Sequence, residues 1–253
     1  MKKKRILLKI GSNTLTKETD HISRGKIEDI GRQIAKLKDQ YEFIIVSSGA
    51  IAAAKQFVKL EHNGQEITVK QALASIGQPH LMRIFQENFR ELGLFTSQCL
   101  LSYSDFEKDV SKENIRNTIN VLVANNFIPI INENDTVATD EIKFGDNDKL
   151  AALTAALINA DLLIIATNTD GIYTKESIDN HDPRTITQVH SLATLEKEIN
   201  TSKSSHGTGG MHSKIEAATI AQKANIETWI VNGIKDNFII NALTEKINFT
   251  TIK

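Results

Sequence analysis

Cysteine, proline, net charge and long apolar runs are all scarce in this chain of 253 residues. Cys99 is the only cysteine, so an internal disulfide is excluded and a reducing compartment is indicated. The sequence holds only 3 prolines, and no Pro-rich linker, internal repeat or low-complexity tract divides it. We therefore expect a single domain over residues 1–253, with at most a weak seam near residue 160.

The formal net charge is −1, which gives no bulk field that would attract nucleic acid or an acidic membrane. The longest apolar stretch, Leu150–Thr167, contains Asn159 and Asp161 and is better read as a helix followed by a strand. The N-terminus lacks the apolar core of a signal peptide. We expect a cytoplasmic protein without a nucleic acid or membrane partner.

Several common site motifs are also missing. The sequence contains no GxGxxG dinucleotide fingerprint and no GxxxxGK[ST] phosphate loop. Its 7 histidines are scattered, none of them in the spacing of a zinc site, and no Ser-His-Asp arrangement can be justified. Hydrolytic and redox chemistry therefore fit this chain poorly.

What the chain does contain is a regular alternation of short β-branched runs with longer segments of helical period. This order predicts an α/β fold, a three-layer αβα sandwich around a mainly parallel sheet. Parallel strands covered on both faces should be continuously apolar, as Phe43–Val46 and Leu162–Thr167 are. The other predicted strands are Arg5–Ile10, Phe95–Leu101, Phe127–Ile131 and Thr228–Val231.

Helices are predicted between these strands. One begins after Ser23, a good N-cap, and its apolar face carries Ile27, Ile30, Ile34 and Leu37. Another is expected to begin at Pro79, because proline suits the first position of a helix. The predicted ranges after the first helix are Ala50–Leu60, Pro79–Leu92, Lys112–Asn125, Asp148–Asn159 and Ser213–Ala224.

Polar residues crowd together after one buried strand. Phe127–Ile131 leads directly into Asn132–Asp135, and Gly145–Asp148 then opens an Ala- and Leu-rich helix. Amides and carboxylates at this density are costly to bury unless they face a cleft or one another, and ligands of open α/β sheets bind at the carboxyl ends of strands. The segment predicts a site for a small polar ligand, with the alternative that Asp146 or Asn147 caps the helix.

Three further elements rich in small residues follow strands or open helices, namely Lys9–Thr14, Val46–Ile51 and His206–Lys214. Their glycines let backbone N–H groups approach an anion, and Lys9 and Lys214 add charges suited to phosphate. Each element alone is also compatible with a tight turn or a flexible loop. Together they supply two lysines, two glycine-rich anion sites and a carboxamide-rich pocket, which favours phosphoryl transfer.

These elements resemble, in order along the chain, the motifs of the amino acid kinase family. The resemblance covers nearly the whole length, and INEND, GDND and GTGGM are specific to the branch that phosphorylates the γ-carboxylate of glutamate. An aspartokinase of the same family would begin KFGGTS and carry regulatory domains, neither of which this sequence shows. The matching stretches are LKIGSNTLT at Leu8–Thr16, VSSGAIAAA at Val46–Ala54, KQALASIGQPHLM at Lys70–Met82, PIINENDTVATDEIKFGDNDKLAA at Pro129–Ala152, TNTDGIYT at Thr167–Thr174 and GTGGMHSK at Gly207–Lys214.

The resemblance implies ATP-dependent phosphorylation of L-glutamate to L-glutamyl 5-phosphate, the first step of proline biosynthesis. Lys9 and Lys214 would stabilise the transferring phosphoryl group, with Asp148 orienting both lysines and Asp146 close to the reacting centre. Glutamate would be held by Ser48, Gly49, Asp135 and Asn147, with Asn134 nearby. The nucleotide would be held by Lys9, Gly11, Thr167, Asn168, Thr208, Gly209, Gly210, Met211, His212, Ser213 and Lys214.

The implied binding roles agree with the chemistry of the side chains. Asp135 offers acceptors for the α-ammonium of glutamate, and Ser48 and Asn147 offer donors for its α-carboxylate. No general base is required, since the γ-carboxylate is already ionised at neutral pH. Mg²⁺ would be held mainly by the ATP phosphates. Residues from about 1 to 160 would bind the amino acid, and those from about 161 to 253 the nucleotide.

Two departures from the family pattern stand out. Position 168 is Asn where many relatives carry Asp, which alters the expected nucleotide contact. The matching region stops soon after the kinase motifs, so we expect no C-terminal RNA-binding-like PUA domain. Alternatives are an N-acetylglutamate kinase of the same family, or a non-catalytic sensor of amino acid or nucleotide. Retention of Lys9, Lys214, Asp146 and Asp148 argues against the sensor.

Regulation and assembly are expectations from the resemblance alone. Proline shares the α-amino acid head of glutamate, so feedback inhibition at the glutamate site is a hypothesis. A homodimer or homotetramer is expected. The segment Lys70–Asn88 is a candidate interface, and an ordinary core helix explains its apolar residues equally well.

Overall fold

The computed structural model describes residues 3–60, 67–138, 147–174, 177, 180, 182–190, 192, 195 and 210–253. Within these residues the strands form a single sheet, in the order β3-β4-β2-β1-β5-β7-β8-β6. Neighbouring strands run parallel except β7 and β8, which are antiparallel. The strands are β1 (Lys4–Ile10), β2 (Tyr41–Ser47), β3 (Phe95–Leu101), β4 (Phe127–Glu133), β5 (Leu162–Thr167), β6 (Gln188–Val189), β7 (Glu227–Asn232) and β8 (Thr250–Ile252).

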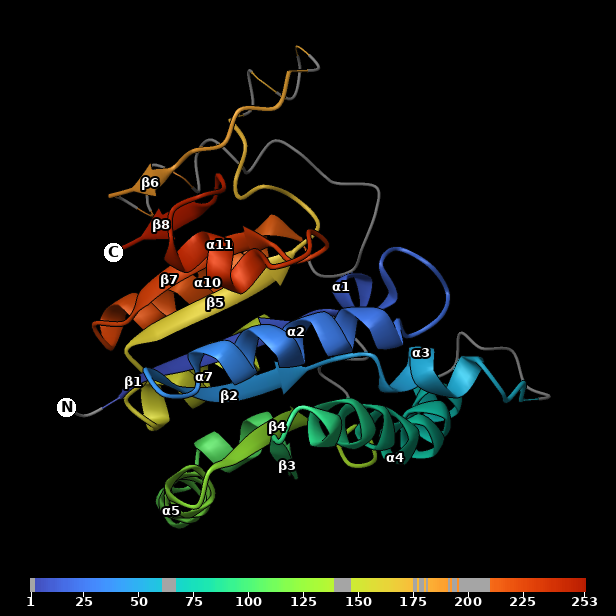
Figure 1. Ribbon diagram of the computed structural model, residues 1–253. Helices are drawn as coiled ribbons and strands as arrows, with labels where there is room; N and C mark the ends of the chain where they lie inside the picture. The colour runs from blue at the N-terminus through green and yellow to red at the C-terminus, as the bar shows by residue number, and fades with distance from the viewer. Residues whose placement is uncertain are drawn as a thin grey trace.

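Successive residues of a strand point to opposite sides of the sheet. Both sides of these strands carry buried apolar residues, and helices cover both faces of the sheet. Ile6 and Leu8 face α2, α4 and α11, which Figure 1 shows for α2 as the blue helix across the sheet. Leu7 and Ile44 face α5, α7 and α10. The described helices are α1 (Ser12–Thr16), α2 (Arg24–Leu37), α3 (Ala50–Lys55), α4 (Ile67–Glu91), the 3₁₀ helix η1 (Tyr103–Phe106), α5 (Asp109–Ala124), α7 (Asp148–Leu157), α10 (Met211–Lys223) and α11 (Phe238–Leu243).

The predicted αβα sandwich with a mainly parallel sheet is confirmed. The six predicted strands are present with ends that differ by no more than two residues, while the short strands β6 and β8 were not predicted. The predicted helix Ala50–Leu60 ends earlier, at Lys55. In the part of the chain that the structure describes, no helix has both the length and the apolar character needed to cross a bilayer.

The prediction that a helix begins at Pro79 is wrong, since Pro79 lies inside the 25-residue helix α4. A proline there removes one helical hydrogen bond and costs about 3 kcal/mol. The helix continues through it because Leu73 on one side and Leu81 and Phe85 on the other are all buried. Burial of each large apolar side chain contributes about 1.5–3 kcal/mol, which outweighs the lost bond. The apolar residues of the candidate interface Lys70–Asn88 therefore belong largely to the core.

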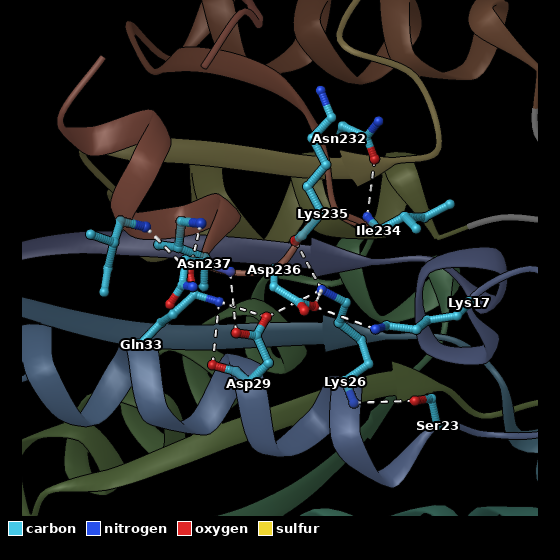
Figure 2. Close-up of polar contacts among 12 residues, drawn as sticks. Lys17, Ser23, Lys26, Asp29, Gln33, Asn232, Ile234, Lys235, Asp236 and Asn237 are labelled. Carbon is cyan, nitrogen blue, oxygen red and sulfur yellow. Dashed lines mark hydrogen bonds and ion pairs between the residues drawn. The ribbon is translucent and has the colours of Figure 1, made fainter. Parts of the chain in front are cut away.

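A buried polar network joins α2 to the loop before α11 (Figure 2). The fully buried Lys26 donates to Asp29 at 3.1 Å and to the carbonyl of Lys235 at 2.9 Å. Gln33 donates to Asp29 at 2.9 Å and accepts from the N–H of Ile239, in the first turn of α11, at 2.7 Å. The predicted apolar face of α2 is correct, but the same helix also buries charged side chains because the network satisfies them.

Candidate active site

Polar side chains from distant parts of the sequence meet at the carboxyl ends of the central parallel strands. Lys9 lies near the end of β1, Ser47 ends β2, and Asn132 lies near the end of β4. Lys9 points to the same face of the sheet as Leu7, two residues before it, and this is the face covered by α7 and α10. The edge of the sheet predicted to bind ligand is therefore the one at which these groups gather.

Two lysines share one buried carboxylate at this edge. The Nζ atom of Lys9 lies 2.6 Å from Oδ1 of Asp148, and that of Lys214 lies 3.0 Å from Oδ2. Asp148 is fully buried, and the side chains of Lys9 and Lys214 are only 4% and 9% exposed. Two cations around one anion leave a net positive charge, so this arrangement can receive a further anionic group.

The ionisation of Asp148 follows from its partners. Burial alone would raise the pKa of this carboxyl, but the adjacent Lys9 and Lys214 ammonium groups hold the pKa well below its usual range. The hydroxyl of Ser213 also donates to Oδ2 of Asp148, at 3.1 Å. Asp148 therefore stays ionised at neutral pH and fixes the two lysines in place.

The turn after β2 adjoins the same site, since the Ser48 hydroxyl lies 3.3 Å from Nδ2 of Asn147. Gly49 has φ +100°, a conformation that favours glycine, and a Cβ there would lie 3.2 Å from Ile22. The N–H of Ser48 bonds the carbonyl of Ile10 at 3.1 Å, which ties this turn to the end of β1. Next to β1, a Cβ at Gly11 would lie 3.4 Å from Nζ of Lys9, so this glycine adjoins the lysine.

Side-chain amides line the site between β2 and β4. Asn147 occupies the N-cap position of α7 as expected, yet its side chain makes no capping bond. Its Nδ2 instead donates to the carbonyl of Ser47 and to Oδ1 of Asn132, both at 2.8 Å, and lies 3.3 Å from Oγ of Ser48. The amide therefore links three strand and helix ends rather than capping one helix.

Asp135 lies two residues beyond β4 and is only 7% exposed. Burial raises the pKa of its carboxyl to about 6. Its Oδ1 has no hydrogen-bond partner among the described residues, while its backbone carbonyl accepts from Gln71 at 3.0 Å. A buried carboxylate oxygen with an open valence is suited to a cationic ligand group. Asn134 is half-buried, and its N–H donates to the carbonyl of Leu101 at 2.7 Å.

Apart from Lys9 and Gly11 at the end of β1, the described residues predicted to bind the nucleotide lie at the end of β5 and the start of α10. Asn168 follows the half-buried Thr167 and donates to Glu18 at 3.0 Å, a contact that an aspartate at 168 could not make. In the next turn, Asp170 accepts from Asn232 at 2.9 Å and pairs with Lys235 at 2.6 Å. Asn232 is the last residue of β7 and Lys235 follows three residues later; Figure 2 labels both.

Gly210 precedes α10, and Met211, His212 and Ser213 form its first turn. The Ser213 hydroxyl lies 2.8 Å from the Gly210 carbonyl and 3.1 Å from Oδ2 of Asp148, and the two acceptors share its single proton. The start of this helix is therefore tied to the lysine–aspartate cluster. Three predicted site residues, Asp146, Thr208 and Gly209, lie outside the described residues.

Sequence reasoning missed several residues that the structure places in or beside the site. Gln78 on α4 accepts from Asn132 at 2.8 Å, and Glu18, Gln71 and Lys235 make the contacts given above. Gln71 and Gln78 lie inside the matching stretch Lys70–Met82, but that stretch does not indicate which of its side chains reach the site. Glu18 and Lys235 have no such signal, and the partners of all four lie on other elements. Within the described ranges, no group of three or more His, Cys, Asp or Glu side chains could hold a metal ion.

Solved structures with the same fold include two small-molecule kinases. A UMP kinase from Ureaplasma parvum superposes with a TM-score of 0.66 at 18% identity, over 100% of each chain. A carbamate kinase from Giardia lamblia bound to AMP-PNP superposes with a TM-score of 0.68 at 16% identity, over 99% of this chain and 98% of that one. At these identities the likeness concerns the fold alone.

Sequence relatives are much closer. A glutamate 5-kinase from Streptococcus pneumoniae (strain Hungary19A-6) is 40% identical over 97% of this chain and 67% of the relative. Those from Alkaliphilus metalliredigens and Neisseria gonorrhoeae are 40% and 39% identical, over 94% and 83% of their own lengths. The sequence model of the amino acid kinase family matches residues 4–232. From the family match and these relatives, the chain belongs to the amino acid kinase family.

Proposed function

We propose that this protein transfers the γ-phosphoryl group of ATP to the γ-carboxylate of L-glutamate, giving L-glutamyl 5-phosphate and ADP. The observation that carries the proposal is the pair of lysines on Asp148, together with relatives at about 40% identity that are glutamate 5-kinases. The product is an activated acyl phosphate, the first intermediate of proline biosynthesis.

The two lysines address the main obstacle to this reaction, which is the repulsion between two anions. Both the attacking carboxylate and the γ-phosphate are negatively charged, and charge spreads over the phosphoryl oxygens as transfer proceeds. Lys9 and Lys214, fixed by Asp148, supply cations in a buried setting where they act strongly. The γ-carboxylate is ionised at neutral pH, so it attacks phosphorus directly and no side chain needs to remove a proton.

Residues from about 1 to 160 bind the amino acid in this proposal. Asp135 accepts from the α-ammonium, and Ser48, Gly49 and Asn147 receive the α-carboxylate, with Asn134 and Asp146 nearby. The buried, open Oδ1 of Asp135 supports free glutamate over N-acetylglutamate, because acetylation removes the positive charge that this oxygen would pair with.

Residues from about 161 to 253 bind the nucleotide. Gly11, Thr167, Asn168 and the segment Thr208–Lys214 contact ATP, while Glu18 orients the amide of Asn168. Magnesium reaches the site bound to the phosphates and contributes charge neutralisation there. Lys9 and Lys214 fit this role, since they offer cations to the phosphates.

Hydroxylamine trapping tests the reaction directly, because it converts an acyl phosphate to a coloured hydroxamate. ADP release and hydroxamate are measured with L-glutamate, N-acetyl-L-glutamate and L-aspartate at equal concentrations of acid and MgATP. We expect turnover with L-glutamate alone. Turnover with N-acetyl-L-glutamate or L-aspartate instead would support the same mechanism with a different substrate. No turnover with any of the three acids would favour a non-catalytic sensor.

Regulation and assembly extend the proposal. L-Proline shares the α-amino acid head of glutamate and would occupy the same pocket, so its inhibition should weaken as glutamate is raised. Inhibition that is independent of glutamate concentration would exclude this. A homodimer or homotetramer is the assembly we propose, and light scattering measures it.

A further inference from the structure

Gln78 is a buried polar residue of α4 with half of its hydrogen-bonding capacity unused. Its side chain is 8% exposed, and its Nε2 has no partner among the described residues. A buried amide donor without an acceptor costs about 1–3 kcal/mol, so native proteins rarely keep one without a reason. A ligand that accepts a hydrogen bond would remove this cost.

The orientation of the Gln78 amide is fixed by a chain of neighbours. Asn147 must present Nδ2 to the Ser47 carbonyl, which only accepts, and Asn132 must present Oδ1 to the Glu133 N–H, which only donates. The remaining group of Asn132 is therefore Nδ2, which donates to Oε1 of Gln78 at 2.8 Å. The Ser47 carbonyl and the Glu133 N–H therefore fix the orientation of all three amides, and the group of Gln78 that lacks a partner is its NH₂ and not its carbonyl.

The position of Gln78 places this donor beside the amino acid pocket. The preceding residue, Gly77, packs so tightly on α3 that a Cβ there would lie 1.8 Å from the carbonyl oxygen of Ala50. Ala50 directly follows the Ser48–Gly49 turn, so this part of α4 adjoins the turn. Gln71, seven residues earlier and thus on the same helical face, donates to the carbonyl of Asp135. Gln78 therefore lies on the face of α4 from which Gln71 contacts Asp135, one residue from the contact with α3.

Two buried groups at this pocket have complementary open valences. Nε2 of Gln78 can donate, and Oδ1 of Asp135 can accept. An α-amino acid head presents a carboxylate and an ammonium group on the same carbon atom, which is the pattern that one donor and one acceptor would bind. An alcohol or a simple carboxylate would satisfy only one of them.

We propose that Gln78 Nε2 binds the α-carboxylate of the amino acid substrate and is a specificity-determining residue of this site. The inference rests on the proposed function, since it assigns a contact to the same substrate. A hydrogen bond from an amide to a carboxylate stabilises the complex enough for its loss to weaken substrate binding about 10- to 100-fold. Because the α-carboxylate does not react, the loss should fall on KM for glutamate and spare kcat and KM for ATP.

Two substitutions separate this role from packing. Gln78→Glu keeps the oxygen that accepts from Asn132 and replaces the donor with a second oxygen, whereas Gln78→Leu removes both groups. Gln86→Glu and Gln86→Leu are the matched controls, on the exposed side of the same helix. The measurements are kcat, both KM values and the Tm without substrates, for the wild type and all four variants.

We expect Gln78→Glu and Gln78→Leu to raise KM for glutamate at least 10-fold, with kcat and KM for ATP within about 3-fold of wild type and both controls unchanged. If Gln78→Leu raised KM and Gln78→Glu did not, the amide would act only through Asn132 and the inference would fail. It would equally fail if kcat fell at unchanged KM, or if both variants lost their folded transition. If the wild-type enzyme does not phosphorylate glutamate, both the proposed function and this inference are wrong. If the wild type is active and the Gln78 variants have the wild-type KM for glutamate, this inference alone is wrong.

Discussion

Lys9 and Lys214 lie at opposite ends of the sequence and bind opposite oxygens of one carboxylate, that of Asp148, at 2.6 and 3.0 Å. Neither lysine therefore has an independent position. The carboxylate sets the spacing and direction of both ammonium groups, and its own charge is secured by them. The consequences can be measured in the intact enzyme.

Asp148→Asn should lower kcat at least about 100-fold, because the two buried lysines lose the anion that positions them and repel one another. The steady-state kcat with saturating glutamate and MgATP measures this. Asp109→Asn, at a fully exposed position, is the control and should leave kcat within about twofold. A kcat within tenfold of wild type for Asp148→Asn would contradict the positioning role.

Glutamate binding should depend on the ionisation of Asp135, whose pKa burial raises to about 6. In the proposed complex the ionised carboxylate pairs with the substrate ammonium, and this form is lost as the pH falls through 6. We therefore expect kcat/KM for glutamate to fall by up to tenfold per pH unit below pH 6, with kcat/KM for ATP much less affected. Asp135→Asn should remove this pH dependence and lower kcat/KM for glutamate about 10- to 100-fold at pH 8.

The same carboxyl also affects stability. Its folded pKa lies above the unfolded value of 3.8, so the folded state takes up this proton first. The contribution of Asp135 to stability therefore rises as the pH falls from 6 towards 4, and it is unfavourable above pH 6. Urea unfolding of the wild type and of Asp135→Asn across this pH range measures the difference in their free energies of unfolding.

The same variant also tests the substrate assignment. If Asp135→Asn left glutamate kinetics unchanged and raised KM for N-acetylglutamate instead, the assignment to glutamate would be wrong.

Gly77→Ala should destabilise the protein by about 3 kcal/mol or more, because the new Cβ would overlap the carbonyl oxygen of Ala50 at 1.8 Å. Gly25→Ala is the matched control in helix α2, where nothing lies within 4 Å of the added atom. This second change should be neutral or stabilise by up to about 1 kcal/mol. Denaturant unfolding measures both, and equal effects would show that α3 and α4 separate easily.

Lys26→Met should destabilise the protein by about 3–5 kcal/mol, since it leaves Asp29 buried without its cation. The Lys235 carbonyl would lose its donor as well. Lys36→Met, at an exposed position of the same helix, should change the free energy of unfolding by less than about 0.5 kcal/mol. Similar results for the two variants would mean that the network shown in Figure 2 contributes little to stability.

The sequence was most informative where local pattern and packing agree. Continuous apolar runs such as Leu162–Thr167 predicted buried strands correctly, and the polar residues after Ile131 lie at the carboxyl ends of the strands, as predicted. The prediction at Pro79 was wrong because it used only the local preference of proline for the first position of a helix. Burial of the apolar residues before and after Pro79 outweighs that preference. Lys26 and Gln78 could not be placed, because a charged or amide side chain is buried only when partners from distant segments satisfy it.

The central place of β1 in the sheet also sets when catalysis becomes possible during synthesis. Lys9 leaves the ribosome early and its strand can pair with β2 soon afterwards, but its other neighbour, β5, follows more than a hundred residues later. Pairings over such separations form slowly, and domains fold as the chain emerges. Until α10 packs onto α7, Asp148 has only Lys9 as a cationic partner from this cluster. A nascent chain can thus bring Lys9 to Asp148 before Lys214 has been synthesised.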